Sequence, residues 1–123
     1  MSTYYFVAAS EAFLTKEEPL AEVLSERRRN YAENNKEIDF WLILNPTFLD
    51  SSQFANQAAS VPRPAAAVIS TDRSFIDFMK LRLEFVFKGE FEAPSAAIPD
   101  PLAHGAWALH GALEIQGIPP EFA

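Results

Sequence analysis

The chain has 123 residues, 49% of them hydrophobic, with eleven phenylalanines, no cysteine and a formal net charge of −7. This length and composition suit one domain with its own apolar core and argue against a disordered chain. The negative charge disfavours nucleic acid as a partner, and the absence of cysteine excludes disulfides, zinc fingers and iron–sulfur clusters.

The first third of the chain predicts a strand followed by a helix. Tyr4 to Ala9 is an aromatic and small-apolar run that is typical of a strand. A helix is expected after Pro19, because proline is tolerated in a first helical turn and apolar residues then recur at helical spacing as far as Tyr31. The pair Asn34–Asn35 marks its end. Arg27 falls inside the apolar stripe, where either its stem covers apolar surface or its guanidinium docks an acidic partner.

Two further strands are expected in the middle of the chain. Ile38 to Leu44 is apolar at nearly every position, which suits a central strand covered on both faces, and Asp39 is the charged exception. Ser51 to Ser60 is compatible with a short helix. Ala65 to Ser70 is small and β-branched and predicts the third strand.

A second long helix should follow the third strand. Thr71 or Asp72 can cap its start, and we expect it to run to Lys88. Gly89 is then expected to end the helix in the left-handed backbone conformation that is common at helix C-termini. At about 100° per residue, Arg82 lies between the apolar side chains of this helix. An arginine is therefore placed on an apolar stripe for a second time.

The last third of the chain is rich in proline. Three prolines between Gly89 and Leu102 disfavour both a helix and a central strand, so an extended segment lying on the domain is expected. We expect the domain to span residues 1–103. Residues 104–123 form an extension whose order the sequence does not define, although Trp107 to Ile115 is compatible with a short amphipathic helix.

Motifs that carry catalytic or metal chemistry are missing from the sequence. His104 and His110 are six residues apart, lack the Glu-x-x-His pattern and have no cysteine beside them, so no metal site is expected. There is no Gly-x-Ser-x-Gly elbow, and Gly89 is the first glycine, so no phosphate-binding loop is available. The sequence predicts a protein that is not an enzyme and holds no cofactor.

Three stretches become distinctive when they are taken together. They are Glu37 to Leu42, Pro64 to Thr71, and Lys80 to Leu102. In this order, and with Glu18 to Leu24, they resemble the hypothetical chloroplast reading frame fifty-four family of cyanobacteria and plastids. The resemblance runs from about Thr3 to Ala103 and implies an α+β fold, a single domain with a small, mainly antiparallel sheet of three to four strands flanked by helices.

The resemblance also implies a role. The family is the small auxiliary subunit of magnesium-protoporphyrin IX monomethyl ester oxidative cyclase, so the implied partner is the di-iron catalytic subunit, with other enzymes of chlorophyll biosynthesis as further candidates. No apolar run approaches the roughly 20 residues of a membrane span. The implied location is the cytoplasm or the plastid stroma, at the thylakoid membrane only peripherally and through partners.

We expect Asp39, Phe40 and Arg82 to form the partner-binding site. All three fall in segments that carry the resemblance, and the strand and helix patterns single out Asp39 and Arg82 as charges among apolar neighbours. The alternatives are that the two charges pair with each other or with backbone groups, and that Phe40 is simply core. A binding site of this kind would need no catalytic residue and no metal.

A second functional class remains open at this point. Aromatic side chains could line a pocket that carries a magnesium-tetrapyrrole, since apolar macrocycles need concave apolar walls with few polar anchors. Against this carrier role, only His104 and His110 are available as axial ligands, and both lie outside the region of resemblance.

Overall fold

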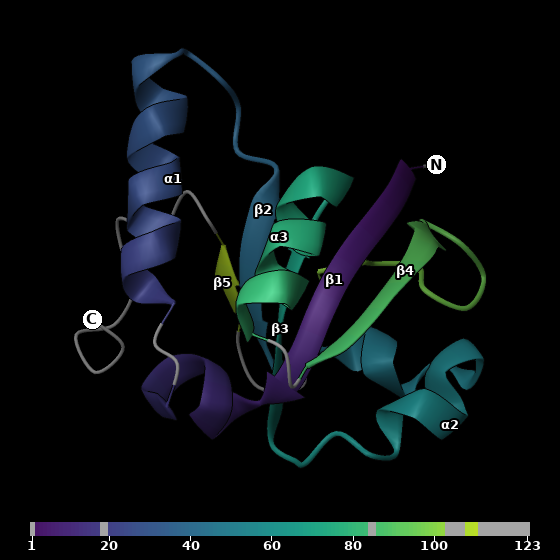
Figure 1. Cartoon of the computed structure of the whole chain (residues 1–123). Coiled ribbons are helices and arrows are strands. Elements are labelled where there is room, and N and C mark those ends of the chain that lie inside the picture. Colours follow the sequence, from purple (N-terminus) through teal and green to yellow (C-terminus); the bar gives the residue numbers. More distant parts are fainter. Residues whose placement is uncertain (1, 18–19, 84–85, 103–107, 111–123) are drawn as a thin grey trace.

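The computed structural model describes residues 2–17, 20–83, 86–102 and 108–110 (Figure 1). These residues build a single sheet with helices on both faces, so the α+β fold expected from the sequence is confirmed. In chain order the elements are β1 (Ser2–Ser10), a π-helical turn η1 (Phe13–Glu17), α1 (Ala21–Glu33), β2 (Phe40–Leu44), the 3-10 turns η2 (Thr47–Asp50) and η3 (Ser52–Phe54), α2 (Ala55–Ala58), β3 (Ala65–Ser70), α3 (Arg73–Leu83), β4 (Phe87–Ala93) and β5 (Ala108–His110).

The strands lie in the order β4-β1-β3-β2-β5, and each neighbouring pair is antiparallel. The four longer strands form the predicted antiparallel sheet, and the three-residue β5 adds a fifth strand along β2. β3 is the middle strand and is buried at all six positions, because both of its faces are covered. β2 has a neighbour on each side, as its nearly continuous apolar sequence predicts.

α1 and α3 cover one face of the sheet (Figure 1). The side chains that meet there are apolar residues of the two helices and alternate residues of β1, β2 and β3, in keeping with the period of two along a strand. Leu24 of α1, Met79 of α3 and Val68 of β3 are among those that are almost fully buried. The helix expected after Pro19 is therefore confirmed, including its end at Asn34.

The segment from η2 to α2 covers the opposite face. The core of this face is built around Phe6, whose ring centroid lies 4.7 Å from that of Phe48 and 5.3 Å from that of Phe54. Phe87 and Phe91 of β4 complete this ring cluster. Five of the eleven phenylalanines thus serve to pack this one side of the sheet.

The predicted second helix is wrong at its carboxyl end. α3 ends at Leu83 rather than Lys88, and Gly89 lies inside strand β4, with no left-handed backbone. Glycine is needed there for close approach, since a Cβ at this position would lie 2.7 Å from Cζ of Phe6. β4 is an edge strand, and Pro94 follows it directly, as the proline-rich sequence of this segment allows.

The helix considered for Trp107 to Ile115 is wrong where it can be compared with the structure. Ala108–His110 form strand β5, paired with Trp41, Leu42 and Ile43 of β2. The other residues of that segment lie outside the described part of the chain. Among the described residues, no helix is both long enough and apolar enough to cross a membrane.

Candidate partner-binding site

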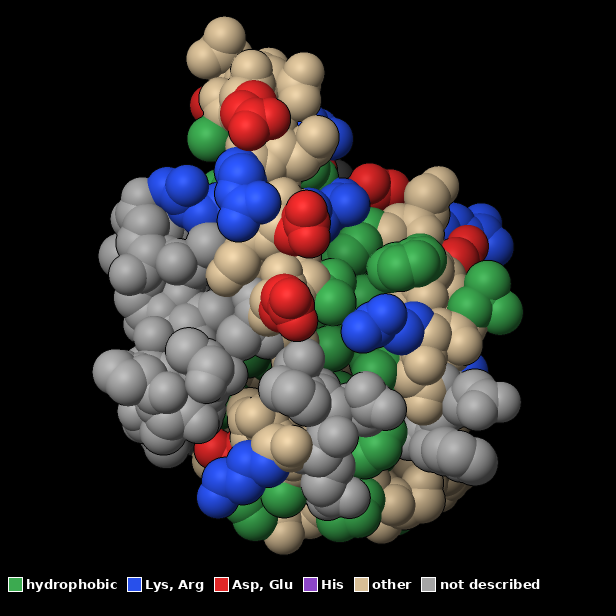
Figure 2. All heavy atoms as spheres, turned by 60° about the vertical axis from the view of Figure 1, so that its left-hand side comes forward, with side chains coloured by type: hydrophobic (Ala, Val, Ile, Leu, Met, Phe, Trp, Pro, Cys, Tyr) green, Lys and Arg blue, Asp and Glu red, His purple; other side chains and the backbone are tan. Residues whose placement is uncertain are grey.

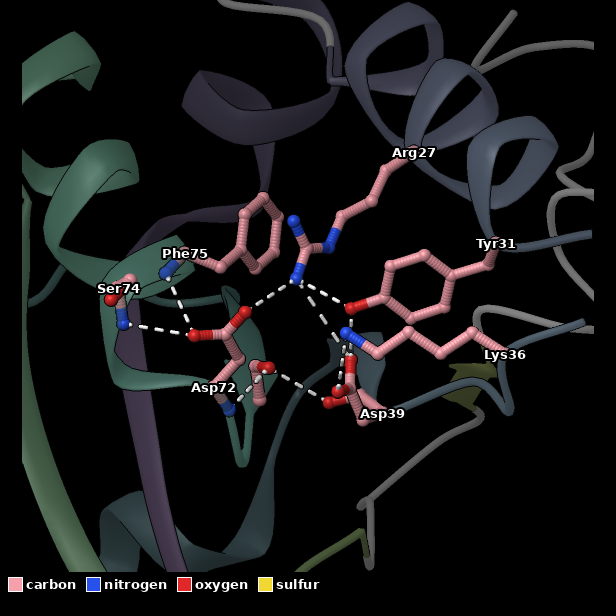
Figure 3. Close-up of polar contacts among 8 residues, drawn as sticks. Arg27, Tyr31, Lys36, Asp39, Asp72, Ser74 and Phe75 are labelled. Atoms are coloured by element: carbon pink, nitrogen blue, oxygen red, sulfur yellow. Dashed lines mark hydrogen bonds and ion pairs between the residues drawn. The ribbon is translucent and has the colours of Figure 1, made fainter. Parts of the chain in front are cut away.

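Arg27 and Tyr31 lie one turn apart on the face of α1 that is turned toward α3 and the start of β2 (Figure 3). The guanidinium carbon of Arg27 lies 3.8 Å from the ring centroid of Phe75 and 5.3 Å from that of Phe40. Its side chain is only 21% exposed. The aliphatic stem and the planar guanidinium of Arg27 therefore lie over aromatic surface. This agrees with the first of the two sequence interpretations, in which the stem covers apolar surface.

The polar edge of the same guanidinium is held by a hydrogen-bond network. Nη2 of Arg27 donates to Oη of Tyr31 at 2.6 Å and to Oδ2 of Asp72 at 2.9 Å. The Tyr31 hydroxyl donates in turn to Oδ1 of Asp39 at 2.7 Å, and Nζ of Lys36 lies 4.0 Å from Oδ2 of Asp39. One arginine therefore joins α1 to the residues that precede β2 and α3.

Asp72 also caps α3. Its Oδ1 accepts hydrogen bonds from the backbone N–H groups of Ser74 and Phe75, which are free donors at a helix start. The hydroxyl of Ser70 donates to the backbone oxygen of Asp39 and accepts from the N–H of Asp72. The predicted cap at Asp72 is confirmed, and the same carboxylate receives Arg27.

The network shifts the pKa values of two of its groups, Tyr31 and Asp72. Burial, and then the hydrogen bond that its hydroxyl donates to Asp39, raise the pKa of Tyr31 above its ordinary value. Burial alone would also raise the pKa of Asp72. The hydrogen bond from Arg27 and the two backbone N–H groups outweigh burial and hold the pKa of Asp72 below its ordinary value.

The structure separates the three residues expected at a partner-binding site. Asp39 and Phe40 are neighbours beneath α1, where Asp39 takes part in the network and Phe40 is fully buried. Arg82 lies on the last turn of α3, about 15 Å along the helix axis from Asp72. Asp39 is therefore paired with Arg27 and Lys36, not with Arg82, and Phe40 is core.

Arg82 lies on an exposed part of α3. It forms no hydrogen bond or ion pair with the part of the chain that the structure describes. Phe78, four residues before it on the helix surface, is 51% exposed, and the adjacent Leu81 is 80% exposed. On the face turned forward in Figure 2, hydrophobic side chains lie open among basic and acidic ones. We call Phe78, Leu81 and Arg82 the α3 patch.

Sequence reasoning missed parts of this arrangement. The helical wheel places Arg82 among apolar side chains, but no local pattern indicates that Phe78 stays half exposed or that Leu81 is exposed. The contact of Arg27 with Asp72 joins residues 45 apart in the sequence, so no local pattern reveals it. The signal that did exist was an arginine among apolar residues, which pointed to Arg27 as well as to Arg82.

Comparison with known proteins places this geometry in a family. The family model described as Ycf54 protein matches residues 2–93. The Ycf54-like protein of Synechocystis is 57% identical over 103 residues, which are 84% of this chain and 77% of the relative. The chloroplastic protein YCF54 of Arabidopsis thaliana is 43% identical over 75% of this chain and 43% of its own length. The solved structure of All0216 from Nostoc has a TM-score of 0.83 and 57% identity, covering 85% of this chain and 97% of the Nostoc chain.

Proposed function

This chain belongs to the Ycf54 family, and on that basis we propose that it is a non-catalytic auxiliary subunit of the aerobic magnesium-protoporphyrin IX monomethyl ester oxidative cyclase. In this role it binds the di-iron catalytic subunit and assists its assembly. The identity of this partner is part of the proposal and is supported by the family membership alone. The α3 patch supplies a surface for it.

The observation that supports a binding role is that Arg82 is exposed and has no polar partner among the described residues. A long charged side chain beside the exposed Phe78 and Leu81 has no polar partner within the described chain, although the comparable Arg27 has two acidic neighbours. Arginine with apolar neighbours is typical of residues that dominate protein interfaces, because its planar fork pairs with carboxylates and its stem packs on apolar surface.

Asp39 and Phe40 take a supporting part in the proposed function. Phe40 offers no surface to a partner, since it is fully buried with its ring 5.8 Å from that of Phe75. Asp39 holds Tyr31 through a hydrogen bond. Both residues therefore act on partner binding through the position of α1 relative to α3, while Arg82 makes the contact.

The relatives are cyanobacterial and chloroplastic by name. The proposed location is accordingly the cytoplasm of a cyanobacterium or the stroma of a plastid. Contact with the thylakoid membrane would be peripheral and would come through the cyclase subunit and through other enzymes of chlorophyll biosynthesis.

Loss of the protein tests the proposed role. A strain without this chain should accumulate magnesium-protoporphyrin IX monomethyl ester, and the full chain supplied on a plasmid should restore its conversion. The purified chain alone should convert none of it. Turnover by the isolated protein, or a deletion strain with an unchanged level of the ester, would overturn the proposal.

One observation favours the carrier role as a second candidate. A depression of about 630 Å³ beside the end of β1 and the start of β4 is lined largely by apolar residues such as Phe13, Val61 and Phe87, and its volume is in the range of small-molecule sites. Titration with the magnesium-porphyrin ester separates the candidates. A saturable red shift in absorbance supports the carrier, and its absence removes it.

A further inference from the structure

The two sides of the sheet end in strands of different character. β4 forms one edge, where Lys88, Glu90 and Glu92 are exposed and Pro94 follows directly. Charges and a proline of this kind hinder the addition of a further strand. β2 lies next to the other edge, and its five residues, Phe-Trp-Leu-Ile-Leu, include neither a charge nor a proline. What protects this side of the sheet is the short strand β5, which pairs with β2 from outside.

Hydrogen bonds at the two ends of β2 show which of its backbone groups face outward. The N–H of Thr71 donates to the backbone oxygen of Asp39 at 3.2 Å, and the N–H of Asn45 donates to that of Ala65 at 2.7 Å. Successive residues of an antiparallel strand bond to opposite sides, so the odd-numbered residues of this segment bond to β3. The even-numbered residues direct their N–H and C=O groups away from β3. They are Phe40, Leu42 and Leu44.

β5 covers the middle of this outward-facing row. Leu109 lies opposite Leu42, and because Leu42 faces outward, these two residues form the pair that exchanges backbone hydrogen bonds. β5 is three residues long and lies beyond residue 93, where the family match ends. A strand this short at the edge of a sheet can open locally while the rest of the domain stays folded. β5 is therefore suited to be a removable cover of β2.

We propose that the outer edge of β2 is a strand-addition site, which β5 occupies in competition with an extended, uncharged peptide segment of a partner protein. The partner segment pairs antiparallel with β2 through its backbone, as β5 does. An uncharged segment fits because β2 offers no charge to pair with, and the occupant in the structure is Ala-Leu-His. Because β5 belongs to the same chain, its effective concentration at the site is high. The partner segment therefore binds only to the fraction of molecules in which β5 has left.

The test opens the site in the full chain. Leu109→Pro removes the N–H that faces Leu42, whereas His110→Pro, the matched control, removes an N–H that faces away from β2. Amide hydrogen exchange followed by NMR reports on the edge. The N–H of Leu42 should exchange at least about tenfold faster in Leu109→Pro than in the wild type or in His110→Pro. The N–H of Ile43, which faces β3, should stay protected in all three proteins.

The probe for the open site is a synthetic peptide with the sequence of residues 105–113. It should restore slow exchange at the Leu42 amide of Leu109→Pro. It should bind the wild type and His110→Pro at least about tenfold more weakly, because β5 competes for the site in both. A peptide with proline in place of Leu109 should protect the Leu42 amide in none of the three proteins.

Three results would overturn the inference. Equal exchange of the Leu42 amide in the wild type and in Leu109→Pro would show that β5 does not cover this edge. A Leu42 amide that exchanges fast in Leu109→Pro and stays unprotected with the peptide would show that the edge accepts no added strand. Loss of protection at Ile43 in Leu109→Pro would show that β5 is an essential part of the sheet and not a removable cover.

Discussion

Arg27 contacts both the aromatic rings and the acidic groups that hold α1 on the sheet. Its guanidinium lies over Phe75 and bonds to Asp72 and Tyr31, so it contributes packing and polar contacts together. The helical wheel predicted that Arg27 lies on the apolar face. The identity of its acidic partners could not be predicted, because the carboxylates come from segments that only the tertiary fold brings together.

Replacement of Arg27 by alanine should destabilise the fold. The change leaves Asp72 and Asp39 near each other without a cation between them and uncovers the ring of Phe75. We expect a loss of about 1 to 3 kcal/mol in the free energy of unfolding, below the range for fully buried pairs because the side chain is partly exposed. Urea denaturation measures it.

Arg29→Ala is the matched control. Arg29 lies on the same helix, but its side chain is 67% exposed and its ion pair with Glu26 is 3.8 Å long. Exposed pairs of this kind contribute at most about 1 kcal/mol. Equal stability of the Arg27 and Arg29 variants would show that the network contributes nothing beyond an ordinary surface contact.

Asp72 should make stability depend on pH in the acid range. Its pKa is lower in the folded state than the ordinary value of 3.8, so the folded chain binds its proton less readily. The stability that the carboxylate contributes is complete above that ordinary pKa and is lost as the pH falls through the folded pKa. The Asp72→Asn variant keeps a helix cap but lacks the titrating carboxylate. The difference in the free energy of unfolding between the wild type and this variant should therefore shrink as the pH falls from about 6 to about 3. A constant difference across that range would contradict the assigned shift.

At the scale of elements, the boundary between α3 and β4 shows where sequence reasoning failed. Phe87, Gly89 and Phe91 alternate with Lys88 and Glu90, a period of two that indicates a strand. The helical pattern from Phe75 onward runs into this alternation without a break, so local periodicity assigned the overlap to the helix. Three-dimensional packing against β1 decides in favour of the strand.

Gly89→Ala should destabilise the sheet although alanine is ordinarily acceptable in a strand. The added Cβ would meet Cζ and Cε1 of Phe6 at 2.7 and 2.9 Å, and that ring is fully buried among other aromatic rings. Overpacking of this kind costs about 1 to 3 kcal/mol, measurable by urea denaturation. Glu90→Ala, on the exposed side of the same strand, should stay within about 0.5 kcal/mol of the wild type. A Gly89→Ala protein as stable as the Glu90→Ala protein would show that Phe6 can move aside.

At the scale of the whole molecule, the order of strands and helices was largely predictable from the sequence, and the sheet order was not. The sequence patterns placed β1, β2, β3 and α1 within a few residues, because each is bounded by proline, asparagine or polar residues. The short β5 has no comparable pattern, since its three residues gain strand structure only by pairing with β2.

Truncation after Ala103 should leave a folded domain. The match to the Nostoc structure covers 97% of the Nostoc chain but only 85% of this chain, and the family match ends at residue 93. We expect a cooperative thermal transition only a few degrees lower, the difference coming from the lost pairing of β5 with β2. Loss of a cooperative transition would show that residues 104–123 are part of the core.

The most direct test of the auxiliary role is the identity of the protein that a tagged full chain retains in a chlorophyll-making cell lacking its own copy. The account predicts that mass spectrometry finds the di-iron cyclase subunit as the main retained protein, and that Arg82→Ala at equal bait level retains much less of it. A lysate that contains the subunit and an eluate that lacks it would contradict the account.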